Sequence, residues 1–202
     1  MCMRDISFAD KFLLKYEDHG THDASVQNGL LRDVRYVVSP NCDARPPERV
    51  IDTLVVHNIS LPPGEWGGDD VLKFFTNTLD ANAHPFYASL GGVRVSSHFY
   101  IRRNGELIQF VPCDLRAWHA GDSLWRGRSA VNDFSIGIEL EGSDTAFFMK
   151  AQYDALAKLT SMLCERYPIV DIVGHSDIAP GRKTDPGPLF DWENYYFITA
   201  SL

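Results

Sequence analysis

Residues 134–142 read FSIGIELEG, and this stretch decides the class of fold. Apolar and polar side chains alternate along it, with Phe134, Ile136, Ile138 and Leu140 on one side and Ser135, Gly137, Glu139 and Glu141 on the other. A period of two residues is typical of a β-strand that packs one face on a core and turns the other face away. We therefore predict a strand here, with an apolar face and a polar face that carries two carboxylates.

Further strands are predicted on both sides of this stretch. Two β-branched runs each end on a histidine, VIDTLVVH at residues 50–57 and IVDIVGH at residues 169–175. Between them, SSHFYIRRNGELIQFVP at residues 96–112 has the pattern of a β-hairpin. Its centre is Asn104-Gly105, a dipeptide that accepts the positive φ angles of a type I′ turn, so we predict that turn.

Helices are predicted between and after these strands. One begins with an aspartate of residues 69–70 as its N-cap, and a last one begins at Asp191. A longer helix is capped within residues 143–145 and ends at Tyr167, before a proline. Its inward face comprises Tyr153, Leu156, Leu159, Thr160 and Leu163. Residues 76–93 are predicted as a long loop. Because strands and helices interleave, we expect an α/β fold, a single domain whose mixed central β-sheet is flanked by helices.

Composition sets limits on partners and location. The chain has 202 residues and a net charge of −8, which suits one domain and disfavours nucleic acid, because a negative field repels phosphates. No apolar run reaches the length of about 18 residues that spans a membrane, so we expect no membrane partner. The first twenty residues are interrupted by charges and lack the apolar run of a signal peptide. We therefore expect a cytoplasmic monomer.

The least regular part of the sequence is its beginning. We divide the chain into a partly ordered N-terminal extension, residues 1–35, and a main domain, residues 36–202. The four cysteines are Cys2, Cys42, Cys113 and Cys164. They include no C-x-x-C pair, and we expect free thiols that pack as small apolar side chains.

Several polar groups have the chemistry of a metal site. His57 and His175 stand at the ends of predicted strands, where ligands gather in α/β sheets, and Asp185 follows in the loop GHSDIAPGRKTDPGP (174–188). Two imidazoles and one carboxylate form a catalytic zinc set that leaves a fourth position for water. The spacing alone does not favour this set over one that includes His98 or His119, and each histidine by itself is more often a hydrogen-bonded structural residue.

Two carboxylates and a lysine are candidates for proton transfer and charge stabilisation. Glu139 and Glu141 share the polar face of the strand, and a glutamate there is suited to move a proton from water to a leaving amine. For Glu141, at the strand end, we expect exposure to solvent instead. Lys183, two residues before Asp185, is suited to stabilise an oxyanion, although a lysine in such a loop is usually solvated.

A series of motifs resembles one known family. The motifs are VVHNISLPPGEWGGD, DANAHPFYA, VSSHFYIRRNGELIQFVP, RAWHAGDS, NDFSIGIELEG and GHSDIAPGRKTDPGPLFDW. In this order they resemble the AmpD-type anhydro-N-acetylmuramyl-L-alanine amidases, which belong to a zinc amidase family that includes the peptidoglycan recognition proteins. The resemblance runs from about residue 36 to residue 192 and implies a mixed sheet with zinc (Zn2+) in a surface groove.

The resemblance also implies roles for individual residues. It assigns the zinc ligands to His57, His175 and Asp185, the catalytic carboxylate to Glu139 and the oxyanion-stabilising lysine to Lys183. His98 and His119 become groove or support residues. The substrate-binding residues that we expect are Asn58, Arg94, Trp118, His119 and Arg128. Arg94 and Arg128 are chosen to hold stem-peptide carboxylates, and Ala130 departs from the family pattern where a further arginine is expected.

The implied reaction is hydrolysis of the amide between the lactyl group of anhydro-N-acetylmuramic acid and the L-alanine of the stem peptide. Such an enzyme recycles cell-wall fragments in the cytoplasm and thereby limits β-lactamase induction. Two alternatives remain: an envelope amidase that acts on intact peptidoglycan, and a non-catalytic peptidoglycan-binding module. The first would carry an export signal, and the second typically lacks the third ligand, which Asp185 supplies here.

Overall fold

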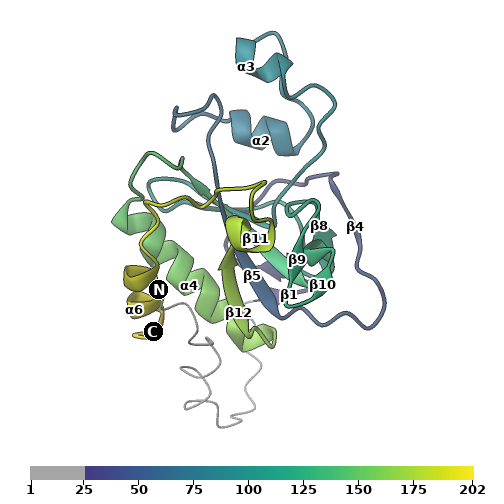
Figure 1. The fold of residues 1–202 in the computed structure, drawn as a ribbon, viewed down its shortest axis with the longest axis vertical. Coiled ribbons are helices and arrows are strands. Elements are labelled where there is room, and N and C mark those ends of the chain that lie inside the picture. The colour runs from purple at the N-terminus through teal and green to yellow at the C-terminus, as the bar shows by residue number, and fades with distance from the viewer. Residues whose placement is uncertain (1–25) are drawn as a thin grey trace.

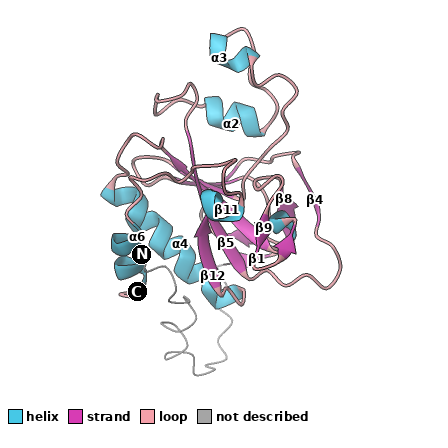
Figure 2. Cartoon of the chain, viewed as in Figure 1, coloured by secondary structure: helices cyan, strands magenta, loops and turns pink. Residues whose placement is uncertain are grey.

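The computed structural model describes residues 26–202, and a six-stranded mixed sheet lies at its centre (Figures 1 and 2). The order of the strands across the sheet is β12-β5-β11-β6-β7-β3. Their bounds are β3 (Arg35–Tyr36), β5 (Thr53–Ile59), β6 (Phe99–Ile101), β7 (Leu107–Gln109), β11 (Ser135–Glu141) and β12 (Asp171–Gly174). The four strands from β12 to β6 are parallel, and β7 is antiparallel to β6. The predicted α/β class with a mixed central sheet is confirmed.

Strand β11 forms from the alternating stretch and lies between β5 and β6. All seven of its residues are buried, so both faces are covered and not only the apolar one. The apolar side chains Ile136, Ile138 and Leu140 join the main hydrophobic core. Our expectation that Glu141 faces solvent is wrong: its carboxylate is buried and accepts hydrogen bonds from Gly67 N (2.6 Å) and Arg103 N (2.9 Å).

The two histidine-bearing strands flank this region. Strand β5 begins at Thr53 and continues to Ile59, so His57 lies inside the strand and not at its end as expected. Strand β12 ends at Gly174, and His175 opens the one-turn helix α5 (His175–Ile178). The carboxyl-terminal halves of these parallel strands therefore lead to one edge of the sheet, where ligands collect in such folds.

Two helices, α4 (Lys150–Arg166) and α6 (Trp192–Thr199), cover one face of the sheet (Figure 1). All five side chains predicted to face inward from the long helix are buried. Its end is as predicted, but it begins after Met149 and not within residues 143–145. The side chain of Gln152 fixes this start: it accepts from Met149 N and donates to the carbonyls of Glu141 and Ile101.

Helices α2 (Asp70–Phe75) and α3 (Pro85–Ala88) lie at one end of the molecule (Figure 1), and the buried side chains of α2 share a hydrophobic cluster with Tyr100 of β6 and Ile108 of β7. The predicted start at residues 69–70 is confirmed, although Asp69 makes no capping hydrogen bond and instead pairs with Arg102. The prediction of a loop at residues 76–93 is wrong in part. Pro85 at the first helical position and the His84 side chain, which accepts from Phe86 N at 3.1 Å, produce a short helix there.

The hairpin of β6 and β7 forms as predicted, but its turn is of another type. Gly105 N donates to Arg102 O (2.8 Å), and Arg102 N donates to Glu106 O (2.9 Å). Within this loop only Gly105 has a positive φ, +87°, whereas a type I′ turn requires one at Asn104 too. The loop is therefore a three-residue connection with a left-handed glycine at its end. A Cβ on this glycine would lie 2.9 Å from the carbonyl oxygen of Ala151.

Three two-stranded sheets complete the structure. They pair β1 (Val26–Gln27) with β2 (Leu30–Leu31), β4 (Cys42–Ala44) with β8 (Leu115–Ala117), and β9 (Leu124–Trp125) with β10 (Arg128–Ser129). The described part of the predicted extension, residues 26–35, adds strands to the fold, because β3 pairs with β7 and Leu31 N donates to Gln109 Oε1. The remainder of the extension and Cys2 lie outside the described residues. In the part of the chain that the structure describes, no disulfide joins Cys42, Cys113 and Cys164 to one another. Within residues 26–202 every helix is too short or too polar to cross a bilayer.

Candidate metal centre

Three side chains converge at the edge of the sheet where β5 and β12 end. His57 Nδ1 lies 2.9 Å from His175 Nδ1, and each of these atoms lies 3.0 Å from Asp185 Oδ2. Both histidines are almost fully buried, and the aspartate is partly buried. The structure thus brings together the three residues that the resemblance assigned to the metal.

One backbone hydrogen bond and one side chain hold the loop that carries Asp185. Ser176 N donates to the carbonyl of Asp185 (2.9 Å), so the loop folds back on the helix that begins with His175. The amide of Asn58 donates to Pro186 O (3.0 Å) and to Asp144 Oδ1 (2.8 Å). We expected Asn58 to line the substrate groove, but in the structure its amide joins β5 to the ligand-bearing loop.

The donor atoms fit a zinc ion. His175 Nε2 lies 3.1 Å from the carbonyl oxygen of Ala120, so its hydrogen is on Nε2 and Nδ1 presents a lone pair to the cluster. With bonds of about 2.0–2.2 Å, the edge of a tetrahedron around zinc is about 3.3–3.6 Å. The observed separations of 2.9–3.0 Å are a few tenths of an ångström shorter, so a small outward shift of the side chains admits the ion, and two imidazoles with one carboxylate are a common catalytic zinc set.

The charge state of the cluster suits a cation. Burial lowers the pKa of His57 to about 4 against the opposing effect of Asp185, so its imidazole is neutral. Burial raises the pKa of Asp185, but its contacts with the imidazoles of His175 and His57 outweigh this effect and hold that pKa below its usual range. The cluster therefore presents a carboxylate and neutral imidazole nitrogen, which are the forms that bind metal.

Glu139 lies beside this cluster on the central strand. It is the register partner of His57 across the parallel pair of β11 and β5, so both side chains leave the same face of the sheet. Glu139 is 9% exposed, and its Oε2 has no hydrogen-bond partner among the described residues. Burial and the negative charge of Asp185 raise its pKa well above the usual range, and the positive charge of Lys183 opposes this.

Lys183 lies in the same loop as Asp185 and is exposed. Its positive charge adds to the lowering of the pKa of His57 and opposes the rise in the pKa of Glu139, so the ammonium group is within electrostatic reach of the cluster. An exposed cation near a metal cluster is suited to meet a developing oxyanion.

The two other candidate histidines lie outside the ligand set. His98 is buried, accepts from Gly137 N at Nδ1 (3.0 Å) and contacts Leu115 O with Nε2 (3.1 Å). His119 is 8% exposed and lies behind His57, with its Nδ1 3.0 Å from His57 Nε2. The alternative sets that the spacing left open are therefore not formed. His119 supports His57 from behind, and a contact of His119 with substrate stays a prediction.

The remaining predicted substrate contacts have different surroundings. Arg94 is exposed, and its guanidinium donates to the adjacent carbonyl of Val93 (3.2 Å). Trp118 is half-buried, and its backbone N–H donates to Asn41 O (3.3 Å). Both side chains remain candidates for contact with a ligand.

Arg128 is placed differently from our prediction. Its two terminal nitrogens donate to the carboxylate of Asp52 at 2.8 and 3.0 Å, and the guanidinium lies 3.9 Å from the centre of the Phe134 ring. Asp52 directly precedes β5 and lies five positions before His57. Along an extended strand this spacing corresponds to about 16 Å. These contacts give Arg128 a structural role at the opposite end of the strand.

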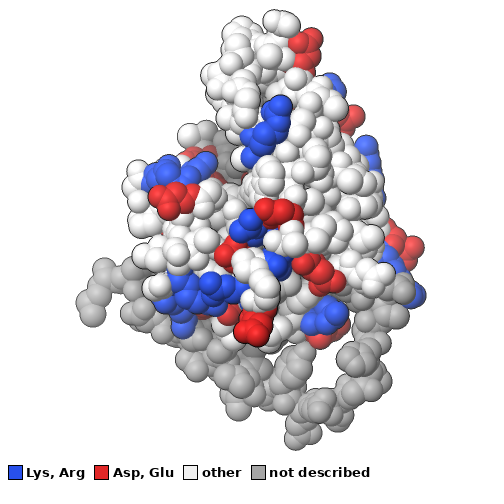
Figure 3. Space-filling model, turned by 90° about the vertical axis from the view of Figure 1, so that its right-hand side faces the viewer, with Lys and Arg blue, Asp and Glu red and all other residues white. Residues whose placement is uncertain are grey.

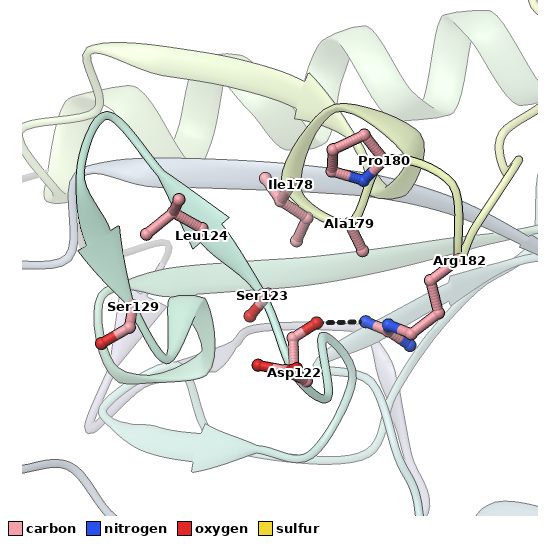
Figure 4. Close-up of a pocket in the computed structure, with 8 residues that line it drawn as sticks. All are labelled: Asp122, Ser123, Leu124, Ser129, Ile178, Ala179, Pro180 and Arg182. Carbon is pink, nitrogen blue, oxygen red and sulfur yellow. Dashed lines mark hydrogen bonds between the residues drawn. The ribbon is translucent and has the colours of Figure 1, made fainter.

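A shallow pocket lies behind the ligand-bearing loop (Figure 4). Its lining includes Arg182, whose guanidinium donates to the carbonyls of Ala120 (2.7 Å) and Asp122. The Ala120 carbonyl thus accepts from Arg182 and from His175 together, which supports the ligand from behind. On the face shown in Figure 3, cationic and anionic groups are interspersed and do not form one continuous basic surface.

Sequence reasoning missed the backbone carbonyl of Ala120 and the joining role of Asn58. A backbone carbonyl leaves no signal in the sequence, because every residue has one. Asn58 directly follows the candidate ligand His57, and this position is the only sign in the sequence that Asn58 supports the site.

Known proteins resemble this chain over most of its length. The family described as N-acetylmuramoyl-L-alanine amidase matches residues 47–188. The 1,6-anhydro-N-acetylmuramyl-L-alanine amidase AmpD of Enterobacter cloacae is 54% identical over 178 residues, which are 87% of this chain and 95% of that protein. AmpD of Escherichia coli is also 54% identical, over 87% of this chain and 97% of that protein.

Solved structures agree with this likeness. The crystal structure of a selenomethionine derivative of AmpD has a TM-score of 0.84 and 52% identity, and the match covers 86% of this chain and 98% of that chain. The amidase AmiD from E. coli, in complex with anhydro-N-acetylmuramic acid-L-Ala-D-γ-Glu-L-Lys, has a TM-score of 0.54 and 34% identity, with 76% of this chain and 60% of that chain covered.

Proposed function

Because the chain belongs to the N-acetylmuramoyl-L-alanine amidase family, we propose that a zinc ion held by His57, His175 and Asp185 serves its reaction. The protein is an N-acetylmuramoyl-L-alanine amidase of peptidoglycan recycling. It hydrolyses the amide between the lactyl group of 1,6-anhydro-N-acetylmuramic acid and the L-alanine of the stem peptide. The observation that carries the proposal is the convergence of three electron-pair donors beside the buried carboxylate of Glu139, whose Oε2 has no hydrogen-bond partner within residues 26–202.

The residues divide the chemistry among themselves. When bound, zinc polarises a carbonyl and lowers the pKa of a coordinated water to about 7. Glu139 accepts the proton of the attacking water and then returns it to the departing alanine nitrogen. Its carboxylate is suited to both transfers because it leaves the same face of the sheet as His57. Lys183 donates hydrogen bonds to the oxyanion of the tetrahedral intermediate from the exposed side of the cluster.

A comparison of three substrates tests this function. Purified, zinc-loaded protein is incubated with an anhydromuropeptide, an ordinary muropeptide and intact sacculi, and mass spectrometry follows release of the stem peptide with a free L-alanine amine. We expect the highest kcat/KM with the anhydromuropeptide and little release from sacculi. Release from none of the three contradicts the function, and a preference for sacculi indicates an envelope amidase. The monomeric state and cytoplasmic location stay predictions, which sedimentation and cell fractionation check.

The two arginines expected to hold stem-peptide carboxylates should behave differently. Arg94→Ala should raise KM for the anhydromuropeptide by about 10–100-fold, because one charge-assisted hydrogen bond contributes about 1.5–3 kcal/mol. Arg128→Ala should leave KM unchanged and lower the free energy of unfolding by about 1 kcal/mol or less, since its ion pair with Asp52 is partly exposed. Steady-state kinetics and urea unfolding measure both effects. A raised KM in the Arg128 variant alone would reverse the two assignments.

A further inference from the structure

A chain of hydrogen bonds runs behind the ligand His57, away from the cluster. His57 Nε2 lies 3.0 Å from His119 Nδ1, and His119 Nε2 lies 3.2 Å from Ser135 Oγ. Ser135 Oγ in turn lies 2.7 Å from the carbonyl oxygen of Val131. All four residues are buried, so water does not compete for these contacts. We propose that His119, oriented by Ser135, is a positioning residue that holds His57 in the tautomer able to bind metal.

The direction of the chain follows from its far end. A backbone carbonyl only accepts, so the single hydroxyl hydrogen of Ser135 goes to Val131 O, the shorter of its two contacts. Ser135 Oγ is then left to accept a hydrogen bond, which His119 donates from Nε2. In a neutral imidazole the other nitrogen carries a lone pair, so His119 Nδ1 is an acceptor.

This acceptor determines the state of His57. His57 donates its hydrogen from Nε2 to His119, and its Nδ1 keeps the lone pair that faces His175 Nδ1 and Asp185 Oδ2. The opposite tautomer would place a hydrogen on Nδ1, inside the cluster, and would require Ser135 to give up its hydrogen bond to Val131 O. Metal ligands generally need such a partner on the other ring nitrogen, and here it is a second histidine.

The ring of His119 is also fixed by packing. Gly137, on the polar face of β11, has no side chain, and a Cβ there would lie 2.5 Å from His119 Cγ. The glycine therefore gives His119 the space that it needs against the sheet. The ring of His98 lies on another side, with its centre 5.7 Å from that of His119. A rigid acceptor loses little entropy when it orients a ligand.

A pair of substitutions of similar size tests the proposal, which rests on the proposed zinc site. In His119→Asn the amide oxygen takes the place of Nδ1 and can accept from His57, whereas His119→Leu has no acceptor. Competition with a chelator at fixed pH measures the zinc affinity of each full-length protein. We expect His119→Leu to bind zinc about 10–100-fold more weakly than the wild type, and His119→Asn to remain close to it.

A spectroscopic readout separates positioning from general loosening. Long-range proton–nitrogen NMR spectra of the full chain, recorded after removal of zinc, distinguish the two neutral tautomers of His57. The wild type and His119→Asn should show hydrogen on Nε2, and His119→Leu should show a mixture. If His119→Leu does not fold, Ser135→Ala replaces it, because it removes the acceptor that orients His119.

Three outcomes decide the question. Equal zinc affinity and an unchanged His57 tautomer in His119→Leu overturn the proposal, as does a loss of affinity in His119→Asn as large as that in His119→Leu. If the wild type itself holds no zinc, the proposed metal centre is wrong. If the wild type holds zinc and the His119 variants bind it equally well, only the proposed role of His119 is wrong.

Discussion

Glu139→Gln should lower kcat by about 10²–10⁴-fold while the protein still holds its zinc, because the change removes the group that takes up and returns a proton. The amide has nearly the same size as the carboxylate, so the buried space on the ligand face of β11 stays filled. Metal analysis together with steady-state kinetics on the anhydromuropeptide measures both parts of this result. Near-normal turnover would mean that another carboxylate moves the proton.

The neighbouring glutamate on the same face of β11 is the matched control. Glu141 accepts from two backbone N–H groups, Gly67 N and Arg103 N. The amide oxygen of Glu141→Gln can still accept from one of them, so we expect some loss of stability but retention of most of kcat. A collapse of activity in Glu141→Gln with little change in Glu139→Gln would exchange the assignments of the two carboxylates.

His175→Ala should reduce bound zinc from about one ion per chain to nearly none and abolish hydrolysis. The expected loss is large because His175 is one of the three proposed zinc ligands, and its removal leaves only two of them. Inductively coupled plasma mass spectrometry of protein purified without chelators gives the zinc content. A wild-type protein that contains no metal under these conditions would contradict the proposed mechanism.

A histidine far from the cluster controls for nonspecific loss of metal. His84 caps helix α3 through its side chain, and asparagine is equally suited to that position. His84→Asn should therefore retain both zinc and activity. If zinc were lost in this variant as well, the metal would be bound by surface histidines and not by the buried cluster.

Much of the fold follows from local patterns in the sequence. The period of two in residues 134–142 predicted β11, and the inward face of the long helix was predicted residue by residue. The pattern did not reveal that the polar face of β11 is buried, because the groups that cover it come from distant parts of the chain. The type of the turn at Gly105 was predicted wrongly for a similar reason. Asn104-Gly105 fits a two-residue type I′ turn and also a three-residue loop with a left-handed glycine, and the structure has the second. Ala151, which contacts this glycine, is distant in the sequence, so the dipeptide alone does not decide between the two loops.

The site was less accessible to sequence reasoning than the fold. Spacing alone left His57, His98, His119 and His175 as competing ligands, and the family resemblance, now confirmed by the comparisons, ranked them. The structure adds the physical reason, since the ring nitrogens of His98 and His119 are engaged in hydrogen bonds outside the cluster. Arg128 was misjudged because its partner, Asp52, is 76 residues away and has no recognisable spacing to it.

The loop that folds back from His175 to Asp185 has a consequence for the durability of the enzyme. His57 and Asp185 are 128 positions apart, so an ion that joins them closes a long segment of chain and exists as a site only in the folded protein. Free metal at 100 times its dissociation constant would favour the folded state by about 2.7 kcal/mol. If the proposed zinc site is correct, scarcity of zinc should therefore shorten the lifetime of the folded protein as well as lower its turnover.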